Sequence, residues 1–181
     1  NSGELVSTSY QFIGIETADL RSQALTGTDT NNETFSISTT AKAVNVNAID
    51  FTSVAAINAG TSTGDAVTTT EPVDADLTAN GNELVASTIN FSNINDADLS
   101  GGELSGTDKN NETFEISTAA NAEKVNAIDF TSVAAINAGT STGDAVTPTQ
   151  TVATTLTATD NDVEASTINS PQIHAAGVSR S

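Results

Sequence analysis

Residues 46–68 read VNAIDFTSVAAINAGTSTGDAVT, and the same sequence returns at residues 125–147. The two copies define a 79-residue period, and all six phenylalanines pair at this spacing. Self-similarity at a fixed period is typical of repeat architectures, in which each unit buries its apolar side chains against the next unit. We therefore interpret the chain as one continuous repeat segment, with units at residues 1–79 and 80–158 and a partial third unit at residues 159–181.

Two shorter periods lie inside the 79-residue unit. An apolar-polar-aromatic triplet occurs twice in each complete unit, at residues 10–12, 49–51, 89–91 and 128–130. Large apolar residues also recur at every fifth position, as in the series Leu84, Ile89, Ile94, Leu99 and Leu104. A period of five is neither that of an α-helix nor that of a simple strand. It suits a chain that turns a corner every few residues and points one large side chain inward from each side.

These periods predict an all-β fold, a parallel β-helix (β-solenoid). Four five-residue sides make a coil of about 20 residues, and coils stacked about 4.8 Å apart form parallel sheets along a rod. Alternating runs such as residues 34–38 (TFSIS) favour strands, and the glycines with neighbouring Asn and Asp favour tight turns. The alternative fold is a tandem pair of β-sandwich domains, which predicts a single internal period.

Two resemblances point the same way. Residues 97–106 (ADLSGGELSG) resemble the A-(D/N)-L-x-x motif of pentapeptide-repeat proteins, which form a four-sided right-handed β-helix. Residues 27–38 and 46–51 resemble repeats in very large bacterial surface proteins, the filamentous-haemagglutinin-like and RTX-like adhesins. The second resemblance implies an extracellular, cell-surface location and a role in adhesion.

The composition narrows the range of partners. The formal net charge is −18, from 23 acidic and 5 basic residues. Such a surface repels nucleic acid and anionic membranes, attracts divalent cations and basic partners, and keeps a long fibre soluble. No apolar run approaches the roughly 20 residues that a membrane helix needs. We therefore expect neither a nucleic-acid partner nor membrane insertion.

Catalytic residues are not evident in the sequence. The chain has no Cys, and its only His, His174, takes the place of Asn95 in the preceding unit and of Glu16 in the first. The acidic residues recur with the repeat, whereas an active site is seldom duplicated in series. No phosphate-binding loop or dinucleotide fingerprint occurs. We therefore expect a protein without catalytic activity.

The best candidate site is a run of oxygen-bearing side chains at residues 29–33 (DTNNE), repeated at residues 108–112 (DKNNE). Closely spaced Asp, Asn and Glu oxygens suit a hard cation, so the candidate cofactor is Ca²⁺. Asp65 and Asp144, each after a glycine, are second-rank candidates. The alternative is a polar turn in which the side chains cap their own backbone. The predicted ligands are Asp29, Asn31, Glu33, Asp108, Asn110 and Glu112.

The leading functional hypothesis is a non-enzymatic, extracellular structural or adhesive segment, a stiff acidic rod within a bacterial surface fibre. Its expected partners are other copies of itself or of the parent fibre, joined end to end, together with surface glycans and divalent cations. One alternative is a self-assembling extracellular filament or surface-layer subunit, because an open solenoid end exposes unpaired strand edges. Another is a β-helix enzyme that acts on polysaccharides, which predicts a carboxylate or basic cluster that breaks the repeat.

Overall fold

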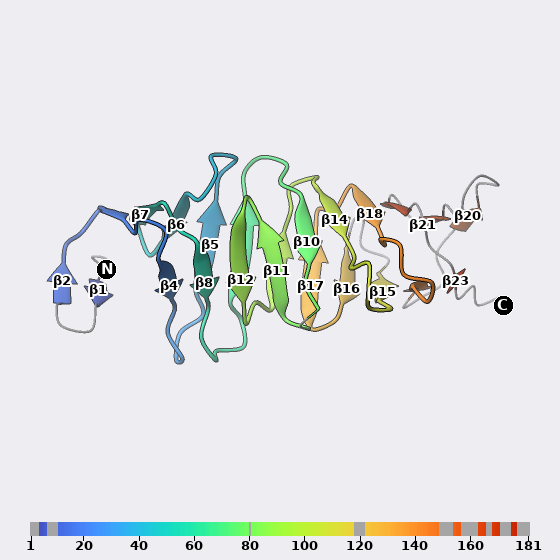
Figure 1. The fold of residues 1–181 in the computed structure, drawn as a ribbon, viewed down its shortest axis with the longest axis horizontal. Coiled ribbons are helices and arrows are strands. Elements are labelled where there is room, and N and C mark those ends of the chain that lie inside the picture. Colours follow the sequence, from blue (N-terminus) through green and yellow to red (C-terminus); the bar gives the residue numbers. More distant parts are fainter. Residues whose placement is uncertain are drawn as a thin grey trace.

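The computed structural model describes residues 4–6, 11–79, 81–117 and 122–148, together with short strands at residues 154–156, 163–165, 168–170 and 175–176. It is an elongated rod, with the first strands at one end and the last strands at the other (Figure 1). Every regular element in the described residues is a β-strand. None of these residues forms a helix long and apolar enough to cross a membrane.

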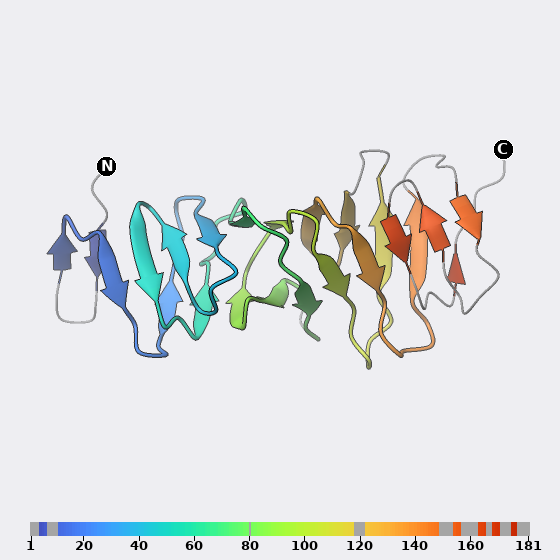
Figure 2. The same ribbon diagram turned by 90° about the horizontal axis from the view of Figure 1, so that it is seen from above.

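Two sheets run along the rod and enclose its core, as the view from above shows (Figure 2). The eleven-stranded sheet has the spatial order β3 (Thr17–Asp19), β7 (Ile49–Thr52), β6 (Val44–Val46), β5 (Thr34–Ile37), β9 (Ala66–Thr69), β13 (Asp96–Asp98), β17 (Ile128–Thr131), β16 (Glu123–Val125), β15 (Thr113–Ile116), β19 (Ala145–Pro148) and β23 (Ala175–Ala176). The ten-stranded sheet has the order β4 (Ala24–Thr26), β8 (Ala56–Asn58), β12 (Ile89–Ser92), β11 (Glu83–Ala86), β10 (Ala75–Leu77), β14 (Glu103–Ser105), β18 (Ala135–Asn137), β22 (Ile168–Ser170), β21 (Val163–Ala165) and β20 (Thr154–Leu156). A separate antiparallel pair joins β1 (Glu4–Val6) to β2 (Gln11–Ile13).

Three-stranded antiparallel meanders recur at β5–β7, β10–β12, β15–β17 and β20–β22. The chain from the start of one meander to the start of the next is half of a repeat unit, and we call it a half-unit. In β5–β6–β7 the last two strands are joined by a two-residue turn, with Val46 paired to Ile49. The turn residues Asn47 and Ala48 have φ angles of 52° and 63°. Positive φ at both central residues is the condition for a type I′ hairpin turn, whose twist matches that of the flanking strands. The meander β10–β11–β12 turns in the same way at residues 87–88.

The path between the sheets explains why the long repeat unit contains two similar halves. Strands β5, β6 and β7 lie in the eleven-stranded sheet, β8 lies in the other, β9 returns, and β10 crosses again. The chain therefore crosses between the sheets three times in each half-unit. Because three is odd, the next meander, β10–β11–β12, lies in the opposite sheet. Only after two half-units, which make one complete repeat unit, does each strand type return to its own sheet.

The predicted β-solenoid is confirmed: the chain forms about four turns between stacked sheets. The coil is longer than the expected one with four five-residue sides. Parallel neighbours lie further apart in sequence than such a coil allows, as in the pairs Ala75 with Leu104 and Ala56 with Asn90. The extra length is the antiparallel meander, so both sheets contain parallel and antiparallel pairs.

The core lies between the sheets and is filled by alternate residues of each strand. Strand β7 shows the pattern, with Ile49 and Phe51 buried and the residues between and after them exposed. The rings of Phe35 and Phe91 come from opposite sheets and meet edge to face, with centroids 6.5 Å apart. This is a favourable geometry for aromatic pairs in a core. The five-residue series behaves as predicted, since Leu84, Ile89, Ile94, Leu99 and Leu104 are all fully buried.

Candidate functional site: the acidic turns

The predicted ligand runs lie in two equivalent structures, which we name the acidic turns. The first comprises residues 28–33 and 62–65, and the second comprises residues 107–112 and 141–144. In each, the loop before one strand packs against the loop before its parallel neighbour: β5 pairs with β9 in the first, and β15 pairs with β19 in the second. The turns are therefore corners at which two successive coils of the solenoid meet.

In the first acidic turn the carboxylate of Glu33 bonds back to its own loop. Its Oε1 accepts a hydrogen bond from the Thr28 hydroxyl at 2.6 Å, and its Oε2 accepts one from the Thr28 N–H at 3.2 Å. The Thr28 hydroxyl oxygen also accepts a bond from the Asn31 N–H at 3.2 Å. The side chain of Glu33 is buried, whereas Asn31 is exposed. These bonds close the loop on itself.

Asp65 joins this loop to the next coils. Its Oδ1 accepts a hydrogen bond from the Glu33 N–H at 2.8 Å, and its Oδ2 accepts one from the Ser62 hydroxyl at 2.7 Å. Its own N–H donates to Oδ1 of Asn95 at 3.3 Å, and its carbonyl oxygen accepts from the Asn95 N–H at 2.9 Å. Asp65 is completely buried. Asp65, which the sequence suggested as a second-rank calcium ligand, thus connects three successive coils.

Asp29 makes a separate contact across the same pair of coils. Its Oδ1 accepts a hydrogen bond from the Thr61 N–H at 3.0 Å, and both residues are exposed. Gly60, which directly precedes Thr61, has a φ of 101°, and a Cβ atom at this position would lie 2.4 Å from the carbonyl oxygen of Thr28. Only glycine allows this close approach of the two backbones. Of the three predicted ligands in this loop, Glu33 is thus buried, whereas Asp29 and Asn31 are exposed.

The second acidic turn repeats these bonds almost atom for atom. Glu112 accepts from the Thr107 hydroxyl at 2.6 Å, and Asp144 accepts from the Glu112 N–H at 2.8 Å. Asp108 accepts from both the N–H and the hydroxyl of Thr140 at 2.9 Å. The Asn110 N–H donates to the Thr107 hydroxyl oxygen at 2.9 Å, as Asn31 does in the first turn. The sequence repeat is therefore also a repeat of side-chain hydrogen bonding.

Two buried carboxyl groups lie in contact in the second turn. Burial raises the pKa of Glu112, and the neighbouring Asp144 raises it further by charge repulsion and by hydrogen bonding, while the bonds from Thr107 oppose this rise. Both side chains are buried, so a polysaccharide cannot reach them. In glycosidases, by contrast, the paired carboxyl groups flank the bond that is cleaved.

The structure gives the carboxylates among the predicted calcium ligands hydrogen-bond partners within the protein. Within the described part of the chain, no group of three or more acidic or histidine side chains is arranged to hold a metal ion. The carboxylates of Asp29, Glu33, Asp108 and Glu112 all accept hydrogen bonds from their own or adjoining loops. Calcium binding by these loops stays a prediction, which a calcium titration followed by thermal melting tests. His174 lies outside the described residues.

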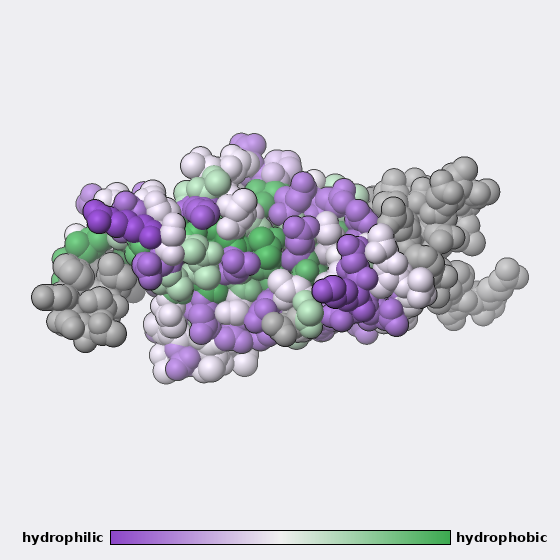
Figure 3. All heavy atoms as spheres, viewed as in Figure 1, coloured by the Kyte–Doolittle hydropathy of each residue, from purple (hydrophilic) through white to green (hydrophobic). Residues whose placement is uncertain are grey.

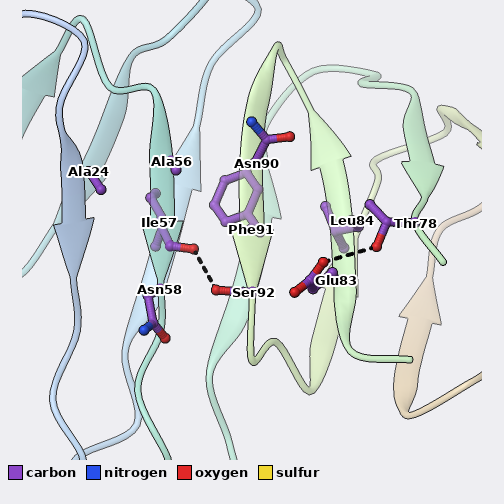
Figure 4. A pocket seen from close by; sticks show the side chains of 10 residues that line it. All are labelled: Ala24, Ala56, Ile57, Asn58, Thr78, Glu83, Leu84, Asn90, Phe91 and Ser92. Carbon is purple, nitrogen blue, oxygen red and sulfur yellow. Dashed lines mark hydrogen bonds between the residues drawn. The ribbon is translucent and has the colours of Figure 1, made fainter. Parts of the chain in front are cut away.

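One hollow of the surface lies beside strands β8, β11 and β12 and has a volume of about 240 Å³ (Figure 4). Apolar residues gather over the same strands between the polar ones (Figure 3). The lining has a single carboxylate, Glu83, which accepts a hydrogen bond from the Thr78 hydroxyl at 3.2 Å. The Ser92 hydroxyl donates to the carbonyl oxygen of Ile57 at 3.4 Å. This hollow therefore has no pair of acidic groups for glycoside hydrolysis, whereas a second hollow, of about 360 Å³, has Asp74 and Asp76 in its lining.

The fold and the acidic turns define a class of architecture, a two-sheet β-solenoid whose coils are joined at repeated acidic corners. Comparison of the chain with protein-family models, with curated proteins and with solved structures gives no significant match.

Proposed function

We propose that this chain is a stiff, acidic, non-enzymatic rod of an extracellular bacterial surface fibre or adhesin. The observation that carries the proposal is the continuity of the two sheets, which run without a break from β3 and β4 of the first repeat unit through the second unit. Each repeat unit adds five strands to each sheet, as the strand order from β3 to β13 in one sheet and from β4 to β14 in the other shows. At about 4.8 Å per strand, one unit lengthens the rod by about 24 Å.

The distribution of contacts supports a mechanical role. The buried Glu33–Asp65 contact and its copy Glu112–Asp144 tie successive coils together at intervals of one unit. The net charge of −18 keeps neighbouring rods apart and attracts divalent cations. Surface glycans and further copies of the repeat are the partners that this role implies.

Small-angle X-ray scattering of chains with two, three and four complete units tests the proposal. A stiff rod gains about 24 Å in maximum dimension with each added unit, while its cross-sectional radius stays constant. Increments that shrink as units are added would show separate bodies on flexible linkers, and the proposal would be wrong. Binding of the same chains to bacterial surface glycans on an array then tests the adhesive part separately.

A self-assembling filament or surface-layer subunit is the second candidate. Among the strands that the structure describes, β3 and β4 each have one neighbour in their sheets, whereas their counterparts one unit later, β13 and β14, are paired on both sides. Because β3 and β4 are the repeat equivalents of these strands, their free edges are suited to pairing with a further coil. Electron microscopy over a range of concentrations distinguishes the two candidates, because end-to-end growth supports the filament and short rods of constant length support the spacer.

A further inference from the structure

One buried residue breaks the apolar pattern of the repeat. Glu123, in strand β16, has 3% of its surface exposed, and neither carboxyl oxygen has a hydrogen-bond partner among the described residues. The residue one unit earlier is Val44, and the residue at the equivalent position of the intervening half-unit is Leu84. Both are buried core residues. A carboxyl group thus occupies a position that the repeat otherwise fills with a hydrocarbon side chain.

The strands on either side of Glu123 give its carboxyl group only apolar neighbours. In the sheet it is paired with Ile116 of β15 and with Phe130 of β17. Ile116 and Phe130, and also Phe114, Val125 and Ile128 on the same three strands, are buried apolar residues. In the other sheet, the buried residues of β14 and β18 are Leu104 and Ile136.

The other charged side chains of β15, β16 and β17 lie on the outer face of the sheet, opposite Glu123. Glu115, Lys124 and Asp129 are exposed, and Lys124 and Asp129 form an ion pair at 2.9 Å. Burial is the sole cause that raises the pKa of Glu123, from an ordinary value of 4.5 to about 8. No charge among the described residues therefore stabilises or destabilises the carboxylate, and desolvation disfavours its ionisation.

We propose that the β15–β17 meander is a proton-dependent weak point of the rod, folded while Glu123 holds its proton and opened locally when Glu123 ionises. The inference is independent of the rod's biological role. A buried carboxylate without a partner has a high desolvation cost, and local opening of the meander lets water reach it. The homologous meander β5–β7, with Val44 at this position, has no such group and is a control within the same molecule.

The direction of the pH effect follows from linkage. The folded meander keeps its proton up to about pH 8, whereas the opened meander releases it near pH 4.5. The contribution of this group to stability is therefore fully present below pH 4.5 and is lost as the pH rises toward 8. Over that window the opening equilibrium constant rises by up to roughly tenfold per pH unit.

Hydrogen–deuterium exchange of the full chain at pH 5 and pH 8, corrected for intrinsic exchange rates, tests the proposal. We expect peptides from β15–β17 to lose protection at pH 8 by a factor of ten or more relative to peptides from β5–β7. Glu123→Gln and Glu123→Val should abolish this difference, and Val44→Glu should introduce it into β5–β7. Glu115→Gln, at an exposed outward position of the same meander, is the matched control and should leave the difference unchanged.

Two results would overturn the proposal. Equal pH dependence in the two meanders of the unmodified chain would show that Glu123 does not control opening. A difference that persists in Glu123→Gln would assign the effect to another group. Carbon-13 NMR of the Glu123 carboxyl group gives a separate readout, because a midpoint near pH 4.5 in the folded chain also contradicts the proposal.

Discussion

Replacement of Asp65 by alanine tests whether the acidic turns hold successive coils together. The Asp65 carboxylate is completely buried and accepts hydrogen bonds from the Glu33 N–H at 2.8 Å and from the Ser62 hydroxyl at 2.7 Å. Alanine removes both acceptors at once. The Glu33 N–H then stays buried without a partner, whereas the half-buried Ser62 hydroxyl can turn toward water.

The size of the effect follows from the unpaired donor. A buried N–H without an acceptor costs about 1–3 kcal/mol, and the loss of the second hydrogen bond adds about 0.5–1 kcal/mol. We therefore expect Asp65→Ala to lower the free energy of unfolding by about 1.5–4 kcal/mol. In a chain of this length, each kcal/mol lowers Tm by about 2–4 °C, so Tm should fall by about 3–16 °C.

Urea unfolding followed by circular dichroism measures this loss, and hydrogen exchange at the Glu33 amide locates it. Asp65→Asn is the matched control, because its side-chain oxygen can still accept from the Glu33 N–H. We expect this variant to stay within about 1 kcal/mol of the unmodified chain. Equal losses in the two variants would show that the hydrogen bond to Glu33 does not stabilise the corner, and an alanine variant of unchanged stability would refute the role of the acidic turn.

Three other changes probe the core, the close backbone contacts and the surface. Phe91→Ala should cost about 3–5 kcal/mol by leaving a cavity between the sheets, whereas Phe91→Leu should cost under about 1.5 kcal/mol, as denaturant titration will show. Gly60→Ala should cost at least about 2 kcal/mol because of its positive φ and the backbone oxygen 2.4 Å from the new Cβ. Gly64→Ala is its control and should cost less, since its Cβ meets only the movable side chain of exposed Asn32, and equal Tm losses would contradict this reasoning. Lys124→Ala should change stability by less than about 0.5 kcal/mol because its ion pair is exposed, and a larger loss that salt removes would contradict this expectation.

The sequence predicted the solenoid and much of its core but not the path of the chain. The five-residue series was sufficient to identify buried positions such as Ile94 and Leu99, because large apolar side chains in a polar chain have few other places to lie. The antiparallel meanders were missed because their tight turns use residues such as Asn47 and Ala48, without the glycine that usually marks positive φ. The coil was therefore expected to be shorter than it is.

The candidate site was predicted in composition but not in arrangement. Residues 29–33 were singled out as a candidate calcium site, with a polar turn as the alternative, and their repetition at residues 108–112 pointed to a shared role. The importance of Asp65 and Asp144 depends on contacts between loops that are distant in sequence, which no local pattern shows. Glu123 could have been found from the sequence alone, since it replaces Val44 in an otherwise similar copy.

The three crossings in each half-unit limit how such a rod can grow by gene duplication. Adding one half-unit would exchange the two faces for everything downstream, and motifs displayed on one side would move to the other. Adding a whole unit preserves the faces and shifts the downstream motifs along the axis by about 24 Å. Recombination between near-identical copies can thus lengthen or shorten the fibre in whole units without altering what each side presents to its surroundings.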